Sequence, residues 1–324
     1  MWPVDFRPEW SYCFFNSKKE GRVSKVGKSC LIVSCLLVVF LLWLPAPASA
    51  AGKGIGFSLR VHGGFSYLGA ADVNTGSKGW FDYLDLLASP LGLTTSGTYG
   101  DLHGGYDFGA DFIIQLTSRI GVGVGAGYLQ SSRTSSMGVT GSGVDATLKE
   151  TPKLSAIPIR LGVFVTWPMG GKLNLTANAG AAYYAAVKFN GLMRLDDHIV
   201  GDWQQQLVTA KSNRLGNIGF QGGLGLEYEL AQRMFIFVEA QGRYARFKNF
   251  DTATGSTNSS LGTGTEDVGK IYLETNTSTS PAGSYTMFLV SDTTPTPEPG
   301  VTEYREPKFD FSGLCLQLGF RVRF

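Results

Sequence analysis

The chain has 324 residues, a formal net charge of +2 and 17% charged residues, whereas an ordinary soluble domain has about 25%. Glycine occurs 43 times, nearly twice its usual frequency of about 7%, and aromatic residues make up 12% of the chain. The near-zero net charge gives no reason to expect nucleic-acid binding, and the many aromatic residues exclude bulk disorder. Glycine without a three-residue period excludes collagen. This composition suits a β protein with many turns.

The N-terminus has the organisation of a secretory signal. Residues 1–29 are polar, residues 30–44 form an apolar run of fifteen, and Ala48-Ser49-Ala50 has the small residues of a cleavage site. The apolar run is shorter than the roughly 20 residues of a membrane-spanning helix. We predict cleavage after Ala50, which leaves 51–324 as one domain. Cys315 is the one cysteine of that domain, so it has no internal disulfide, and no metal site or cofactor is expected.

Strict alternation of apolar with polar or small residues recurs throughout residues 51–324. This period of two is the pattern of a β-strand whose two faces meet different surroundings. In 102–116, for example, Phe108 and Phe112 alternate with Asp107 and Asp111. The alternating runs that we interpret as strands are residues 54–68, 102–116, 119–130, 155–167, 172–189, 214–230, 233–248 and 310–324.

Three features favour a membrane barrel over a soluble sandwich. The runs have 12 to 18 residues, whereas soluble strands usually have about five or six and a tilted membrane strand needs about 9–11. The connections alternate between tight turns and long segments at 69–101, 131–154, 190–213 and 249–308, which is typical of short periplasmic turns and long extracellular loops. The polar faces carry charges at mid-strand. We therefore predict an all-β fold, an up-and-down antiparallel transmembrane β-barrel of eight strands.

Aromatic residues on the apolar faces gather near the two ends of these runs. Such positions are typical of the two aromatic girdles of a membrane barrel. Phe189 is also expected on the lipid face, at the long-loop end. The main expected girdle residues are Phe57, Phe112, Trp167 and Tyr228 at the short-turn end, and Tyr67, Tyr106, Tyr128 and Tyr244 at the long-loop end.

These features resemble the OmpA/OmpX/opacity-type family of eight-stranded outer-membrane β-barrels. The resemblance rests on the segments 121–128, 154–163 and 319–324 and covers residues 51–324. A final Phe324, with Val322 and Phe320 at the third and fifth places from the end, looks like the signal that the barrel-insertion machinery reads in such proteins. The resemblance implies location in the bacterial outer membrane, with the membrane lipid and that machinery as partners.

Small barrels have interiors filled by side chains, and buried charges need partners. We therefore predict a network of ion pairs in the lumen. Strand register places Arg60 beside Asp111 or Gly109, and His62 beside Asp107 or Gly109. The network is either a structural plug or a polar path gated by its charged groups. Its predicted members are Arg60, His62, Asp107, Asp111, Arg160, Glu227, Glu239, Arg243 and Arg321.

A hydrolase arrangement is the enzymatic alternative. Ser66 and His103 are expected to be neighbours near the outer rim, with Asp107 below them. Lipid-modifying barrels of similar outline present their histidine to the lipid, but no histidine of this chain lies on an apolar face. We therefore expect no catalytic residues and no enzymatic activity.

The long connections carry the remaining hypotheses. The pattern of residues 79–87 predicts a short amphipathic helix that closes the outer mouth of the barrel or lies on the membrane surface. Residues 249–308 are rich in Thr, Ser and Gly and of low complexity. They are a mobile surface tuft or an adhesive surface for host, phage or matrix. Within them, 271–273 and 285–290 are expected to pair as a protruding hairpin, or else to raise the strand count to ten.

The favoured function is a non-enzymatic outer-membrane protein whose barrel anchors large surface loops for envelope integrity or adhesion. Its partners would include an extracellular ligand or host surface, and no nucleic acid. The alternative is a narrow channel for small or hydrophobic solutes, as in the OmpW-like relatives that the sequence also resembles. A lipid-modifying enzyme is the third and least favoured interpretation.

Overall fold

The structure, a computed structural model, describes residues 56–324 except residues 213, 251, 280–281 and 297. The predicted signal sequence, with its cleavage after Ala50, lies outside the described residues. The described chain is almost entirely β, with one long helix, so the all-β prediction is confirmed. No helix among the described residues is long and apolar enough to cross a membrane.

Seventeen strands, one α-helix and one short 3-10 helix make up the described chain, so the prediction of eight strands is wrong as a total. The helices are α2 (Ala71–Ala88) and η1 (Ser89–Leu91). The strands are β1 (Gly56–Leu68), β2 (Thr94–Ser96), β3 (Gly104–Gln115), β4 (Ile120–Ser132), β5 (Ser135–Gly141), β6 (Val144–Gly170), β7 (Leu173–Asp197), β8 (Trp203–Ser212), β9 (Ile218–Ala231), β10 (Met234–Tyr244), β11 (Arg246–Phe247), β12 (Thr252–Ser259), β13 (Gly262–Thr279), β14 (Ala282–Ser291), β15 (Val301–Arg305), β16 (Phe309–Asp310) and β17 (Gly313–Arg323).

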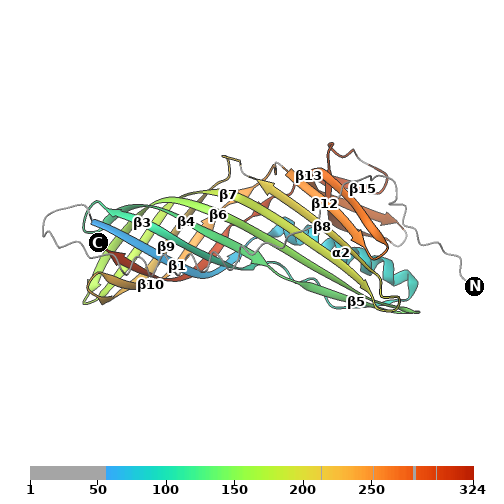
Figure 1. Cartoon of the computed structure of the whole chain (residues 1–324), viewed down its shortest axis with the longest axis horizontal. Helices are drawn as coiled ribbons and strands as arrows, with labels where there is room; N and C mark the ends of the chain where they lie inside the picture. The colour runs from blue at the N-terminus through green and yellow to red at the C-terminus, as the bar shows by residue number, and fades with distance from the viewer. Residues whose placement is uncertain (1–55, 213, 251, 280–281, 297) are drawn as a thin grey trace, which may run out of the picture.

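Eight of these strands form a ring in which each is hydrogen-bonded to two neighbours, and β6 and β7 pair in addition with β5 and β8. The order is β1, β3, β4, β6, β7, β9, β10 and β17, and β17 pairs again with β1. All these pairs are antiparallel. They correspond to the eight alternating runs of the sequence, and Figure 1 shows them as the long tilted strands that end near the C-terminus. The tight connections at 116–119, 171–172 and 232–233 lie at that end.

The segments expected to be loops are largely strands, which is why the total exceeds eight. β6 and β7 have 27 and 25 residues and remain paired far beyond the ring, out to Ala146 opposite Asp197. The sheet continues from β7 through β8 and β12 to β13 and β14 (Figure 1). Strand pairing satisfies backbone groups that an isolated loop would leave to water.

Most of the described residues of the segment 249–308 belong to the strands β12, β13, β14 and β15, where a loop was expected. β13 pairs with β14 with Ile271 opposite Val290 and Leu273 opposite Phe288, as expected for the hairpin. The hairpin joins the extended sheet through β12 and does not widen the ring, so the ten-strand alternative is wrong. Ile271, Leu273 and Val290 are buried, which explains why the hairpin packs down and does not protrude.

A bulge in β7 reverses which residues face inward. The pairing with β6 shifts by one residue between Ser155 opposite Lys188 and Ile157 opposite Ala185, and Ala186 has a positive φ of 49°. Before the bulge Tyr184 is buried, and after it Val187 and Phe189 are buried. The expectation that Phe189 faces lipid is wrong, because one extra residue inverts the period of two.

Helix α2 is longer than the predicted 79–87 helix. Its buried side chains include Val73 and Phe81, and it packs mainly on β14, with further contacts to β6 and β16. Gly79 lies so close to the backbone of Thr286 on β14 that a Cβ would overlap its carbonyl oxygen. The helix thus covers an internal apolar core, and does not lie alone on a membrane surface.

Candidate functional site

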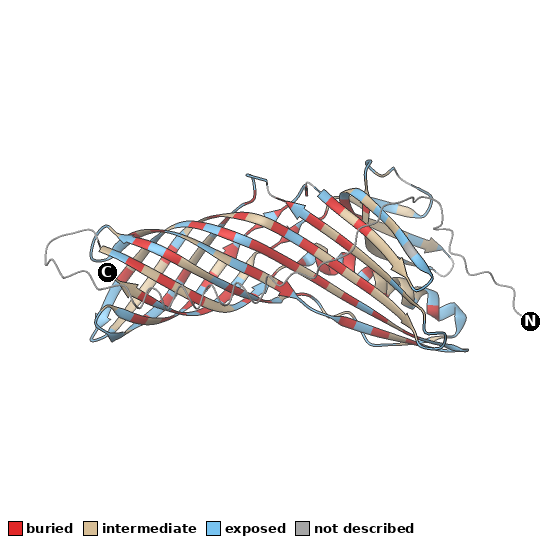
Figure 2. Ribbon diagram, in the orientation of Figure 1, coloured by how far each residue is buried: buried red, intermediate tan, exposed pale blue. Residues whose placement is uncertain are grey.

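The nine residues expected in the lumen are all buried, each 7% exposed or less. They lie on the strands of the ring and alternate with exposed apolar residues, so they face the interior (Figure 2). Their contacts form successive layers from the short-turn end towards the outer end.

Glu227 is the centre of the layer nearest the short turns. It accepts hydrogen bonds from Arg321, from Nη2 of Arg323 at 3.4 Å and from Nδ2 of Asn174 at 3.2 Å. The Arg321 guanidinium also lies 5.1 Å from the ring centre of Phe235. The sequence prediction missed Arg323 and Asn174, although both lie on the polar face of their alternating runs.

Arg60 and Glu239 form the next layer. Nη2 of Arg60 donates to Oε2 of Glu239 at 2.6 Å, and the guanidinium lies 3.9 Å from the ring centre of Phe237. Arg60 is directly opposite Asp111 in the sheet, one of the two predicted positions, but its hydrogen bond goes to Glu239. Register alone therefore placed the backbone and did not identify the partner.

Arg160 organises the middle of the interior. Its Nη2 lies 3.1 Å from Oδ1 of Asp111, and its Nη1 donates to Nε2 of His62 at 3.1 Å. An arginine donor opposite Nε2 makes this nitrogen an acceptor, so the neutral ring carries its proton on Nδ1, 3.6 Å from Asp111. His62 is opposite Gly109, where a Cβ would collide with Arg160 and lie 2.9 Å from Nε2 of His62.

Arg243 joins the charged layers to the core above them. Its Nη1 donates to Oδ2 of Asp107 at 2.7 Å, its Nη2 to Oγ of Ser66 at 3.1 Å, and its Nε to the carbonyl oxygen of Phe311 at 3.0 Å. All of these partners are buried. A guanidinium with three such acceptors is held in one orientation.

An aromatic cluster fills the space beyond Arg243. Tyr184 lies 5.1 Å from Phe247 and 6.3 Å from Phe311, and Phe309 lies 5.1 Å from Phe189, between ring centres. Helix α2 and strands β8, β12, β13 and β14 add aliphatic residues to the same core. The sequence did not predict this core, because Phe309 falls between the expected loop 249–308 and the last expected strand, and Tyr184 was not assigned a face. We call it the aromatic plug: Tyr184, Phe189, Phe247, Phe250, Phe309 and Phe311.

Side chains fill the interior at the level of the charged layers. Asp107, Glu239 and Gln317 are each only 1% exposed, whereas a water-filled lumen would expose them. A cavity between Arg60 and Phe237 has about 10 Å³, room for about one water. The charges are thus held in fixed pairs within a filled interior.

The residues of the hydrolase alternative have other partners in the structure. Ser66 Oγ accepts from Arg243, while Nδ1 of His103 lies 2.9 Å from the carbonyl oxygen of Leu68 and its ring stacks on Tyr67. His198 lies elsewhere, 2.9 Å from the Thr147 hydroxyl. In the described part of the chain no group of three or more His, Cys, Asp or Glu residues is placed to hold a metal ion.

Glu150, on the outward extension of β6, is a buried acid that the sequence analysis did not single out. It lies opposite Ser135 on β5 and Met193 on β7. Removal from water raises the pKa of its carboxyl from 4.5 to about 8, an effect that the nearby Ser77 hydroxyl reduces. The carboxyl is thus neutral over much of the neutral pH range.

The outer surface of the ring is an apolar belt. β17 exposes Leu314, Leu316, Leu318 and Phe320, and all eight expected girdle residues are exposed. Its 11 residues span about 36 Å of extended chain, and a tilt of about 40° reduces this to about 28 Å of height, enough for the roughly 25 Å apolar band of a membrane barrel. Val322 is partly buried, and Phe324 at the end of the chain is exposed.

An apolar outside, a charged and filled inside, and antiparallel strands with short turns at one end define the class as a membrane β-barrel. Comparison with protein families agrees: the model of the outer membrane protein beta-barrel domain matches residues 36–266. The chain belongs to this family and is a barrel protein of the bacterial outer membrane, which confirms the resemblance. A search of curated proteins finds no sequence that matches it.

Proposed function

We propose that this protein is a plugged, non-enzymatic outer-membrane anchor. After removal of residues 1–50, the ring of eight strands would be a closed membrane-spanning barrel. Its function would be to hold the extended outer sheet rigidly above the membrane, for envelope integrity or for contact with an extracellular ligand or host surface.

The observation that carries this proposal is the link between Arg243 and Phe311. One guanidinium joins the paired charges of the barrel to the aromatic plug, so that charged layers and core form one packed body. A pore would need mobile water at this level, and burial of Asp107 and Tyr184 favours a solid interior.

The outward extension supports an anchoring role. β6 and β7 leave the barrel without interruption, and β8, β12, β13 and β14 continue the same hydrogen-bonded sheet. Cross-strand bonds transmit rigidity from the membrane to this outer sheet. The C-terminal strand would recruit the barrel-insertion machinery through Phe320, Val322 and Phe324.

Single-channel conductance is the test. The full-length chain is expressed, and the protein is purified from outer membranes and added to a planar bilayer. An unboiled sample that migrates differently from a boiled one on a denaturing gel shows that the barrel is folded. We expect a silent bilayer from folded protein.

Steady openings whose conductance changes in the Arg160→Gln variant would contradict the plugged anchor and support the narrow channel. Openings that do not respond to this variant would also overturn it, since they require a path around the charged layers. The non-enzymatic part of the proposal is supported by the separate contacts of Ser66 and His103, and hydrolysis of outer-membrane lipid by the purified protein would contradict it.

A further inference from the structure

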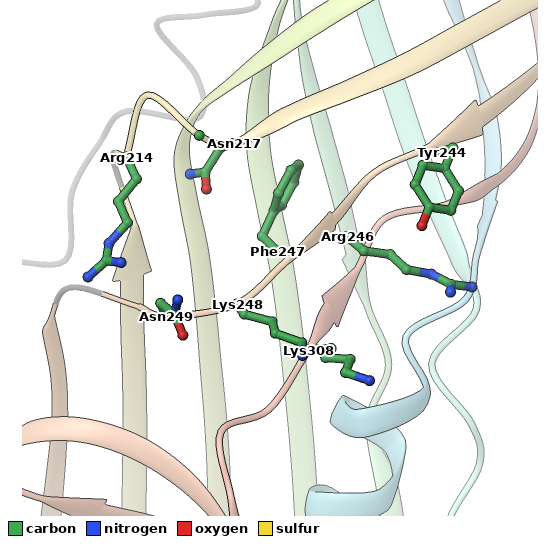
Figure 3. Close-up of a pocket in the computed structure, with 9 residues that line it drawn as sticks. Arg214, Asn217, Tyr244, Arg246, Phe247, Lys248, Asn249 and Lys308 are labelled. Atoms are coloured by element: carbon green, nitrogen blue, oxygen red, sulfur yellow. The ribbon is translucent and has the colours of Figure 1, made fainter.

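A cationic cavity lies at the outer end of the ring, lined by the turn before β9, by the end of β10 with β11 and the residues after it, and by Lys308 just before β16 (Figure 3). Its volume is about 540 Å³, within the usual range of small-molecule sites. Four basic side chains line it and none of its lining residues is acidic. We call it the basic pocket, and its cations are Arg214, Arg246, Lys248 and Lys308.

Lys248 and Lys308 contribute positive charge to this pocket that no neighbouring acid neutralises among the described residues. Nε of Arg246 lies 2.8 Å from Oδ2 of Asp310. Among the described residues, no carboxylate oxygen lies within 4 Å of the ammonium groups of Lys248 and Lys308. Cations gathered around one cavity repel one another, so the site favours an anion.

The aromatic plug positions these cations. Phe247 and Phe309 are buried in the plug, and the alternation of extended chain turns Arg246, Lys248 and Lys308 to the outside. On the other side of the pocket, buried Asn217 donates through Nδ2 to Oγ of Ser212 at 3.1 Å, which holds the turn that carries Arg214. The pocket is thus built on packed residues of three chain segments.

The pocket lies at the outer edge of the lipid-facing belt. Ile218, Tyr244 and Leu314 are the outermost exposed apolar residues of β9, β10 and β17, and the cationic segments lie directly beyond them. Leu215, in the same turn as Arg214, is 84% exposed. An apolar side chain beside a cluster of cations suits the boundary between acyl chains and phosphate groups.

We propose that the basic pocket binds the phosphate group of an anionic lipid in the outer leaflet. The cavity is larger than one phosphate ion, and the apolar rim of Leu215 and Ile218 would contact the acyl chains, so a lipid headgroup fits better than free phosphate. The proposal rests on the outer-membrane location of the protein, and it holds whether or not the barrel is plugged.

The test is a calorimetric titration of the protein in an uncharged maltoside detergent. The probes are dihexanoyl phosphatidic acid, dihexanoyl phosphatidylcholine and inorganic phosphate. We expect the phosphatidic acid to bind at least about tenfold more tightly than the other two. The K248Q/K308Q double variant should lose about tenfold to thirtyfold in affinity for phosphatidic acid, since each cation near a lipid surface contributes roughly a factor of five.

Lys188 and Lys211 provide a matched control, because they are exposed and directly opposite each other on β7 and β8, outside the pocket. The K188Q/K211Q variant should retain affinity within about twofold. Equal losses in both double variants would overturn the pocket and indicate general surface charge. If phosphate and phosphatidic acid bind with equal affinity, and the Leu215→Ser variant leaves both affinities unchanged, the proposal of a lipid ligand is wrong and the pocket is a site for a free anion. The heat-dependent gel shift checks that each variant is folded.

Discussion

Arg60 on β1 donates a 2.6 Å hydrogen bond to Glu239 on β10, although β17 lies between these two strands in the sheet. The two side chains therefore meet across the curved inner face of the ring and bypass the intervening strand. Strands two positions apart in a sheet are separated by about 10 Å, so the two long side chains must reach across the intervening strand to meet. This ion pair is one reason why the interior is solid.

Loss of the Glu239 carboxylate is expected to destabilise the barrel strongly. In the Glu239→Ala variant the Arg60 guanidinium would stay buried without its partner, at a cost of about 3–5 kcal/mol. Urea titration in detergent, followed by the folded band on an unboiled gel, measures the loss. The double variant with Arg60→Met should recover part of it. The exposed Glu303→Ala should stay within about 0.5 kcal/mol, and a loss at Glu239 no larger than this would contradict the buried pair.

Phe309 tests the plug. This side chain is fully buried, with Phe250 at 4.3 Å between ring centres. Phe309→Ala should lower the free energy of unfolding by about 3–5 kcal/mol, because it leaves a cavity in a packed core. Phe220→Ala removes an equal ring from the lipid face, where the side chain is 62% exposed, and should cost much less. Similar losses in both variants would show that no plug has formed.

Glu150 should make stability depend on pH. Its pKa is about 8 in the folded protein and near 4.5 when unfolded, so the unfolded state releases a proton that the folded state keeps. Stability should therefore be highest below pH 4.5 and fall as the pH rises towards 8, by a few kcal/mol in all. The Glu150→Gln variant should remove this slope. Melting temperatures in detergent at pH 5 and pH 8 measure it, and an unchanged slope in the variant would assign it to other groups.

The bulge at Ala186 is expected to strain the backbone, and substitutions at this position test that strain. A positive φ of 49° costs alanine roughly 1 kcal/mol, and glycine avoids this cost. Ala186→Gly should therefore be neutral or stabilise the protein by up to about 1 kcal/mol, and Ala186→Val should destabilise it. The same urea titration measures both. If valine is tolerated as well as glycine, the bulge does not have this conformation in solution.

The alternation of apolar and polar residues was sufficient to predict the eight strands of the ring. It was not sufficient to predict the extended sheet beyond the ring. The runs around Phe108 and Leu316 alternate so regularly that strand, face and neighbour all follow from sequence. The extension was missed because β12 and β13 are rich in Thr, Ser and Gly, a composition that loops share. Phe189 was assigned to the wrong face because a single bulge residue, Ala186, has no distinctive sequence signal.

The sequence by itself determined the membrane-spanning strands, their lipid faces and the set of charges that turn inward, because these depend on a period of two that holds from residue to residue. Only the tertiary structure decided that Arg60 pairs with Glu239, that Phe309 and Phe311 join Tyr184 in a plug, and that Lys248 and Lys308 share a cavity. Lys248 and Lys308 are 60 positions apart in the sequence, and Arg60 and Glu239 are 179 apart. Such groups come together only when the ring closes and its extension folds over it.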